Sequence, residues 1–253
     1  MGRRTHRYLL SAVLLIALPV AAAMGAPDAS RRIGSSVDGR PIEAHTVGSG
    51  SSVVAVIGGI HTGPEEESVH IVEALLAHFR ENETQIPDAV SLVFVPNANP
   101  DGYERGTRVN ARGVDLNRNW PTGDWQPEAV HGDTVVDAGN RPLSEPETAA
   151  LYEYLLELRP LYVLSYHAYA ALIENNGIDA SERLSEVYAQ ATGLEHIDEW
   201  PYYPITGEFI VAMAEVGIAA ADVELERGDS RAFGRHLAGV RAVIEHAAER
   251  HVQ

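Results

Sequence analysis

The sequence VVAVIGGIHTGPEEES, residues 53–68, decides how this chain folds. It opens with a continuous apolar run, and a similar run begins LYVLSYHAY at residues 161–169. Short apolar runs of this kind are typical of strands buried on both faces of a parallel sheet. A histidine follows each run, His61 in the first and His167 in the second. We therefore expect both imidazoles at strand ends, where the sites of open α/β sheets are assembled.

Strand and helix patterns alternate along the rest of the chain. We expect strands near residues 53, 91–96, 161 and 218–225, and helices over 68–82, 144–159, 181–192, 209–216 and 232–249. This alternation predicts an α/β fold, with three layers in the order α/β/α around a central, mostly parallel or mixed sheet. The length of 253 residues and the 45% content of hydrophobic side chains are sufficient for one sizeable core.

A carboxylate close to the first histidine completes a possible metal site. Glu65, Glu66 and Glu67 follow His61 after a short Thr-Gly-Pro segment. Two histidines and one carboxylate form the ligand set of catalytic zinc sites, which leaves one coordination position open. The alternative is an acidic first turn of the next helix, where carboxylates are favoured by the helix dipole. Both interpretations can hold for adjacent glutamates.

The segment TRVNARGVDLNRNWP, residues 107–121, contributes groups that bind anions. It contains Arg108, Asn117 and Arg118, and NPDG at residues 99–102 precedes it. Two guanidinium groups and an amide suit the recognition of a carboxylate or of a developing oxyanion. The alternative is a solvated, arginine-rich surface loop, because the segment holds too much Gly, Asn and Arg for a core.

Together these motifs resemble those of the zinc carboxypeptidases, the superfamily of carboxypeptidases A and B, and within it the small bacterial murein-tripeptide amidases. The resemblance extends from residue 33 to the last helix. Its most specific part is NPDG followed by RVNARGVDLNRNWP. The segments SEPET, SYHAYAALIE, PYYPITGEF and IAAADVELE follow in the order of the family, at residues 144–148, 165–174, 201–209 and 218–226.

The resemblance implies that one Zn²⁺ is held by His61, His167 and a nearby glutamate. The family spaces its first two ligands as His-x-x-Glu, whereas the loop here is one residue longer. Glu65 is the least disruptive choice, with Glu66 second, because Gly63 and a following proline can absorb an insertion within a turn.

The resemblance also assigns the catalytic groups. Glu224 is the expected general base, and Arg108 is expected to stabilise the oxyanion. Glu226 competes with Glu224 for the role of base, because residues two apart on a strand point to the same face. Glu224 is preferred because it matches the family strand better.

Substrate binding follows from the same comparison. Asn117 and Arg118 are expected to grip the terminal carboxylate of the substrate. Tyr203 is expected to close over it, with Tyr202 as an alternative register and a partly exposed aromatic loop as the other interpretation. Glu208 and Phe209 are candidates for the side-chain pocket, where an acid favours a terminal residue that carries an amino group, such as diaminopimelate.

The function implied is that of a zinc metallocarboxypeptidase, a hydrolase that removes a carboxyl-terminal residue from peptides, including diaminopimelate from murein tripeptide. A zinc deacylase of N-acyl amino acids and a non-catalytic envelope-binding protein are the alternatives. The expected partner is a peptide or cell-wall peptide, and we expect a monomer.

The amino terminus has the features of a secretory signal peptide. Arg3, Arg4 and Arg7 precede a mostly apolar run over residues 8–23 that ends in small side chains. We therefore expect a leader over residues 1–25, a single catalytic domain over 26–253 and a secreted protein, periplasmic or extracellular, with no separate pro-domain. An uncleaved anchor is the alternative, but the run is shorter than the ~20 residues that span a bilayer.

Charge and cysteine content exclude several classes of function. The formal net charge is −17, which argues against nucleic acid as a partner because phosphate binding needs a concentrated basic surface. The chain has no cysteine, so disulfides and thiolate ligands are excluded and any zinc must be held by histidine and carboxylate.

Overall fold

The computed structural model describes residues 29–227 and 232–251 of the chain. The predicted signal peptide, residues 1–25, lies outside the described residues, and so it stays a prediction. Within the described ranges, no helix is both long enough and apolar enough to cross a membrane.

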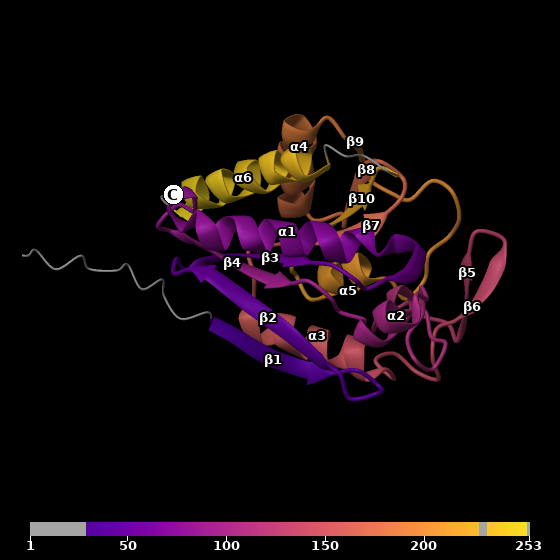
Figure 1. Cartoon of the computed structure of the whole chain (residues 1–253). Helices are drawn as coiled ribbons and strands as arrows, with labels where there is room; N and C mark the ends of the chain where they lie inside the picture. The colour runs from indigo at the N-terminus through magenta and orange to yellow at the C-terminus, as the bar shows by residue number, and fades with distance from the viewer. Residues whose placement is uncertain (1–28, 228–231, 252–253) are drawn as a thin grey trace, which may run out of the picture.

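Within the described residues, the central sheet has eight strands in the order β1-β2-β4-β3-β7-β10-β8-β9 (Figure 1). Strands β4, β3, β7 and β10 run parallel to one another, while β1, β2 and β8 introduce antiparallel pairings. The sheet is therefore mixed with a parallel centre, as predicted. Its strands are β1 (Ala29–Ser35), β2 (Pro41–Gly48), β3 (Ser52–Ile57), β4 (Val90–Val95), β7 (Tyr162–Ala168), β8 (Leu172–Asn175), β9 (Glu195–Ile197) and β10 (Ala220–Leu225).

Helices cover both faces of this sheet. One hydrophobic cluster joins the sheet to α1 (Glu67–Glu81), α4 (Asp179–Thr192) and α6 (Ala232–His251). A second cluster joins the opposite face to α3 (Pro146–Leu158) and α5 (Phe209–Glu215). The predicted three-layer α/β/α fold is confirmed, and all five predicted helices are present with ends shifted by a few residues.

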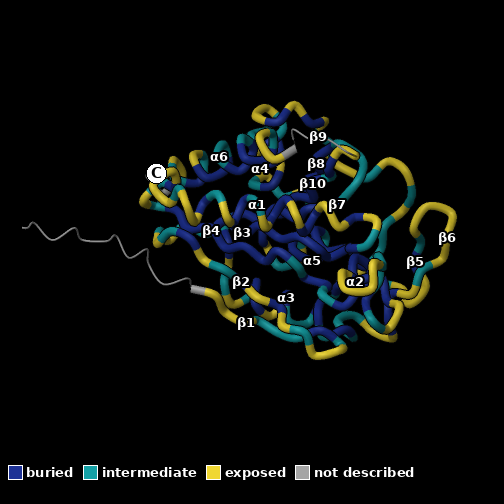
Figure 2. Tube along the Cα trace, in the orientation of Figure 1, coloured by how far each residue is buried: buried dark blue, intermediate teal, exposed yellow. Residues whose placement is uncertain are grey.

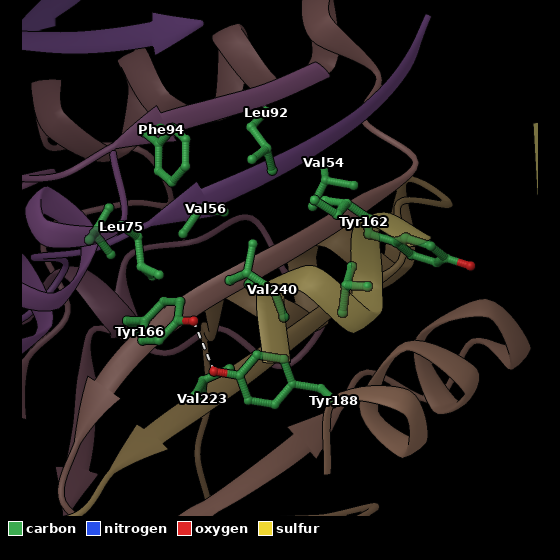
Figure 3. Packing of buried hydrophobic residues seen from close by; sticks show 14 of the residues in the cluster. Val54, Val56, Leu75, Leu92, Phe94, Tyr162, Tyr166, Tyr188, Val223 and Val240 are labelled. Atoms are coloured by element: carbon green, nitrogen blue, oxygen red, sulfur yellow. Dashed lines mark hydrogen bonds between the residues drawn. The ribbon is translucent and has the colours of Figure 1, made fainter. Parts of the chain in front are cut away.

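The central strands are buried on both sides, which explains their continuous apolar sequence. Val54 and Val56 of β3 pack in the first cluster, whereas Ala55 and Ile57 pack in the second. Figure 3 shows the first cluster, in which Val54 and Val56 lie among side chains of neighbouring strands and helices. Each fully buried aliphatic side chain of this kind stabilises the fold by about 1.5–3 kcal/mol.

The face of β7 and β10 that packs on α5 changes from apolar to polar along the strands. In β7, Val163 lies in the second cluster, and Ser165 and His167 follow on the same face. Asp222 and Glu224 of β10 pair in register with Ser165 and His167. Four polar side chains therefore collect at the carboxyl ends of two adjacent parallel strands.

Sequence patterns did not predict the outer strands β1, β2, β8 and β9 or the hairpin of β5 (Glu128–His131) and β6 (Thr134–Asp137). The hairpin stands apart from the main sheet and is largely exposed (Figure 2). These elements are short or carry polar side chains, so they lack the continuous apolar run that marks the central strands.

Candidate active site

A cavity of about 380 Å³ lies at the carboxyl ends of β7 and β10. The residues assigned to the metal, to catalysis and to the ends of the substrate all line it, although they come from five separate segments of the chain. They are His61, Glu65, Arg108, Asn117, Arg118, His167, Tyr203 and Glu224. The pocket candidate Glu208 lines the cavity too. Phe209 does not, because it is fully buried in the second hydrophobic cluster, so its assignment to the side-chain pocket is wrong.

His61, Glu65 and His167 form a group whose ligand atoms all lie within 4.8 Å of one another. The two Nδ1 atoms are 3.2 Å apart. Oε2 of Glu65 lies 3.4 Å from Nδ1 of His61 and 3.8 Å from Nδ1 of His167. All three side chains are buried, so they converge on one point inside the cavity.

A short 3₁₀ helix, η1 (Gly63–Glu65), accommodates the longer loop after His61. Gly63 has φ +59, and a Cβ there would lie 2.6 Å from the carbonyl oxygen of Gly106, so both conformation and space require glycine. The turn brings Glu65 back toward His61. Glu66 is exposed and precedes α1, outside the converging group.

The second ring nitrogen of each histidine, Nε2, has a polar partner of its own. Nε2 of His61 lies 2.7 Å from Oδ1 of Asp115, and Nε2 of His167 lies 3.0 Å from Oγ of Ser165. Because a carboxylate only accepts, the His61 proton sits on Nε2 and the lone pair of Nδ1 faces the cavity. Such partners fix the ring orientation of metal-binding histidines.

The protonation states of the two histidines are suited to binding a cation. Burial, together with the charge of Arg108, lowers the pKa of His61 to about 4, and burial likewise lowers the pKa of His167 to about 4. Both imidazoles are therefore neutral at pH 7, the form that binds metal. Burial raises the pKa of Asp115, but its interactions with the His61 ring and with the Arg108 guanidinium outweigh burial and hold that pKa well below its usual value.

Arg108 lies next to the converging group. Its Nε donates to Oδ2 of Asp115 at 3.2 Å, and its Nη1 contacts Oε1 of Glu65. Asp115 thus links His61 to Arg108. Asp115 was not predicted, although it lies within residues 107–121, because the arginines and the amide were the evident candidates for binding an anion.

The interpretation of residues 107–121 as a surface loop is wrong. Arg118 is only 1% exposed, and Asn117 is also buried. Backbone carbonyls compensate for the buried charge, since Nε of Arg118 donates to Val130 at 3.1 Å and Nη1 donates to Asn117 at 2.8 Å. Nη2 of Arg118 is buried without a hydrogen-bond partner. Oδ1 of Asn117 accepts from the backbone of Phe209 at 2.9 Å, which fixes the amide against the start of α5.

Glu224 and Glu226 have different surroundings. Glu224 lines the cavity beside its register partner His167. Burial raises its pKa to about 8, and the charge of Asp222 adds to this shift. Glu226 lies beyond the end of β10, is exposed and accepts from Arg235 at 2.8 Å.

Aromatic side chains form one wall of the cavity. The ring of Tyr203 is 5.6 Å from that of His131 and 5.7 Å from that of Trp200, both in edge-on contacts. Burial raises the pKa of Tyr203. Tyr202 also reaches the cavity but is 65% exposed. His131 comes from the β5–β6 hairpin and was not predicted, because no sequence pattern connects it to the site.

The family comparison agrees with this geometry. A family model described as zinc carboxypeptidase matches residues 22–194, which is more than half of the chain. The chain belongs to the zinc carboxypeptidase family. The match ends before Tyr203 and Glu224, so the positions of these two residues in the cavity come from the tertiary structure.

Individual members of the zinc carboxypeptidase family are similar to this chain. Murein peptide amidase A of Escherichia coli (strain K12) is 35% identical over 145 residues, 54% of this chain and 56% of the relative. Carboxypeptidase B of Astacus astacus is 27% identical over 165 residues, 55% of this chain and 54% of the relative. The matched region thus spans about half the length of these curated relatives.

Solved structures extend the similarity over the whole fold. The crystal structure of murein-tripeptide amidase from Escherichia coli O157 has a TM-score of 0.70 at 27% identity and covers 91% of this chain and 98% of its own. Bovine thrombin-activatable fibrinolysis inhibitor has a TM-score of 0.76 at 18% identity, covering 88% and 91%. The second likeness supports the fold alone.

The residues present fit the metal of the zinc carboxypeptidase family. Two neutral imidazoles and one carboxylate are the ligands that catalytic zinc prefers, and their free atoms face one another inside the cavity. The partners behind the rings, Asp115 and Ser165, hold the imidazoles in the required orientation. His61, Glu65 and His167 are therefore the residues that would hold the ion.

Proposed function

We propose that the protein is a zinc-dependent hydrolase that removes a carboxyl-terminal residue from peptides. The observation that carries the proposal is the shared cavity: the converging group of His61, Glu65 and His167, the carboxyl of Glu224 and the guanidinium of Arg118 all open into it. These are the parts that metal-assisted hydrolysis beside a free carboxylate requires.

The chemical step is assigned to Glu224 and Arg108. Bound zinc would act as a Lewis acid that polarises the scissile carbonyl and makes water more acidic. Glu224 accepts the proton of the attacking water and passes it to the leaving nitrogen. The cationic surroundings of the loaded site favour the carboxylate form that a base needs. Arg108 stabilises the oxyanion of the tetrahedral intermediate.

Substrate positioning is assigned to Arg118, Asn117 and Tyr203. Nη2 of Arg118 has no hydrogen-bond partner among the described residues, so a substrate carboxylate supplies the missing acceptor. Asn117 adds an amide held against α5, and Tyr203 covers the bound substrate from the aromatic wall.

We further propose that the natural reaction releases diaminopimelate from murein tripeptide, and that residues 1–25 direct the protein out of the cytoplasm to this substrate. The similarity to murein peptide amidase A and the matching crystal structure of a murein-tripeptide amidase support this substrate class. We expect the active form to be a monomer that carries one zinc ion.

The test uses zinc-loaded mature protein and two variants, Glu224→Gln and Glu226→Gln. Each is incubated with L-Ala-γ-D-Glu-meso-diaminopimelate and with a mixed panel of ordinary peptides, and products are identified by mass spectrometry. We expect diaminopimelate release by the wild type and by Glu226→Gln, and none by Glu224→Gln. The Glu226→Gln variant makes the same chemical change outside the cavity.

Other outcomes separate the alternatives. Stepwise shortening of the peptide panel alone would indicate a general carboxypeptidase. Activity on N-acetyl or N-succinyl amino acids but on no peptide would indicate a deacylase. Absence of stoichiometric zinc binding together with inactivity on every substrate would indicate a non-catalytic binding protein.

A further inference from the structure

The β5–β6 hairpin lies outside both hydrophobic clusters of the described residues, and most of its side chains are exposed (Figure 2). Ala129 is buried, whereas Val135 is 64% exposed. A two-stranded hairpin without a hydrophobic face of its own is only marginally stable in water. Contacts with the rest of the protein must therefore hold it in place, and these contacts lie at the active site.

The backbone of the hairpin is tied to two residues of the site. The carbonyl of Val130 accepts from Nε of Arg118 at 3.1 Å, and the carbonyl of Asp137 accepts from the backbone N–H of Asp115 at 2.8 Å. One bond comes from each strand, so both strands are fixed relative to the cavity. His131, the neighbour of Val130, is thereby placed at the cavity wall.

The ring of Tyr203 needs support from outside its own segment. It lies between β9 and α5, in an irregular segment over residues 198–208, so no backbone ladder sets the direction of its side chain. Its contact with Trp200 lies within that same segment. The contact with His131 comes from the hairpin, with the two rings at 89° and their centroids 5.6 Å apart. Edge-on pairs of this kind are favourable beyond the area that they bury.

The charge states of the two rings agree with a packing contact. Partial burial, together with the charge of Arg108, lowers the pKa of His131 to about 4, so the imidazole is neutral at pH 7. Burial raises the pKa of Tyr203, and the positive charge of Arg118 opposes that rise. The phenol thus lies near the guanidinium assigned to the substrate carboxylate, with a neutral aromatic ring at its side.

We propose that the β5–β6 hairpin is a positioning element of the active site, and that His131 is a positioning residue that holds the ring of Tyr203 over the substrate beside Arg118. His131 acts through Tyr203 and takes no part in the chemical step. The inference rests on the proposed peptidase function, and it adds a residue from a segment that no sequence pattern connects with the site.

The first experiment compares His131→Ala with His131→Phe in steady-state kinetics on one peptide substrate. Removal of the ring should raise KM by about 2–10-fold, the size of one edge-on aromatic contact, with a smaller change in kcat. Phenylalanine keeps the edge-on contact and should restore the wild-type KM. The matched control is Val135→Ala, at an exposed position of the same hairpin, which should leave both constants unchanged. Failure of phenylalanine to restore KM would overturn the proposal, because the imidazole would then contact the substrate itself.

A double-mutant cycle tests whether His131 acts through Tyr203. Tyr203→Ala removes the ring that His131 holds, so the addition of His131→Ala to this variant should cause no further loss of kcat/KM. Losses that multiply independently would overturn the proposal, because His131 would then support the site by another route.

An accessibility measurement separates this inference from the proposed reaction. Zinc-loaded protein without substrate is treated with tetranitromethane, which nitrates accessible tyrosine rings. Mass spectrometry of the peptides compares nitration of Tyr203 with that of Tyr202, which is 65% exposed. We expect this ratio to rise about 2–10-fold in His131→Ala and to keep its wild-type value in His131→Phe. A rise in the alanine variant supports the proposal even if no peptide is cleaved, and an unchanged ratio overturns it even if peptides are cleaved.

Discussion

Two groups of buried acids in this protein differ in how well they are paired. At the start of α3, Glu145 accepts from Asn110 at 2.7 Å and from Ser144 at 2.8 Å, while Glu147 accepts from Asn110 at 3.3 Å and from the backbone of Val37 at 3.0 Å. In the cavity, Asp222 keeps an oxygen without a partner and faces Glu174 across the sheet.

The difference separates structural acids from functional ones. Hydrogen-bonded acids at α3 tie loops to the helix and stabilise the fold. In the cavity, by contrast, Asp222 and Arg118 each hold a buried polar atom that has no hydrogen-bond partner among the described residues, which lowers the stability of the fold. Substitutions should therefore affect stability in the first region and activity in the second.

The largest expected effect is that of Glu224→Gln. Without a general base, kcat should fall by about 10²–10⁴-fold. The melting temperature should stay the same or rise, because a buried carboxyl whose pKa is raised by burial is replaced with a neutral amide. Peptide turnover and thermal unfolding measure the two effects. A large loss of stability would place Glu224 with the structural acids.

Arg108→Ala is expected to reduce kcat by about 10²–10³-fold with a smaller change in KM, because the oxyanion loses its donor. Steady-state kinetics measure the changes in kcat and KM separately. Zinc analysis shows whether the metal is still bound after Glu65 loses its contact with the arginine. The control is Arg105→Ala, on the same stretch of chain but exposed and paired with Asp38. Equal losses in both variants would contradict the assignment.

The buried carboxyl of Glu174 should make the stability of the fold depend on pH. Burial raises the pKa of Glu174 to about 8, with a further contribution from Asp222. Between the ordinary glutamate pKa and pH 8, the unfolded chain is ionised at this residue and the folded chain is protonated. Stability therefore falls as pH rises through this window, and the penalty vanishes at lower pH.

Glu174→Gln should remove this pH-dependent loss of stability, which reaches about 1.4 kcal/mol for each pH unit between the ordinary glutamate pKa and pH 8. Denaturant unfolding of the metal-free protein at pH 5 and pH 8 measures it. We expect the variant to lose less stability between the two values than the wild type. If the variant and the wild type lose the same stability between pH 5 and pH 8, Glu174 is ionised in the folded protein.

The α3 region provides the opposite test. Glu147→Ala leaves the partly buried backbone donor of Val37 and the side chain of Asn110 without this acceptor, and we expect the free energy of unfolding to fall by about 1–3 kcal/mol. The kinetic constants of the folded enzyme should not change. Denaturant unfolding and steady-state kinetics on the same preparation measure the two effects. A loss of turnover without a loss of stability would show that the acids at α3 are not purely structural.

Tyr203→Phe is expected to have the smallest effect. The ring keeps its contacts with His131 and Trp200, and only the hydroxyl is lost, so kcat/KM should fall by about 2–10-fold. The control is Tyr202→Phe, at the largely exposed neighbour. A larger effect of the control would favour the alternative register of the two tyrosines.

Much of the fold and part of the site could be predicted from local sequence. Continuous apolar runs identified the central strands, because burial on both faces leaves no polar position. Histidines close after those runs indicated a metal site. The guanidinium groups of residues 107–121 indicated recognition of an anion, because few other roles bring several such side chains together in one short segment. The edge strands and the hairpin with His131 gave no comparable signal.

The sequence by itself therefore determined the α/β layers, the two histidines at the strand ends and the guanidinium groups of residues 107–121. The tertiary structure decided which of several adjacent or similar residues face the cavity. The η1 turn selected Glu65 over Glu66, the end of β10 separated Glu224 from Glu226, and strand register placed Asp222 opposite Glu174. These choices depend on pairing between segments distant in the chain, which local sequence patterns do not encode.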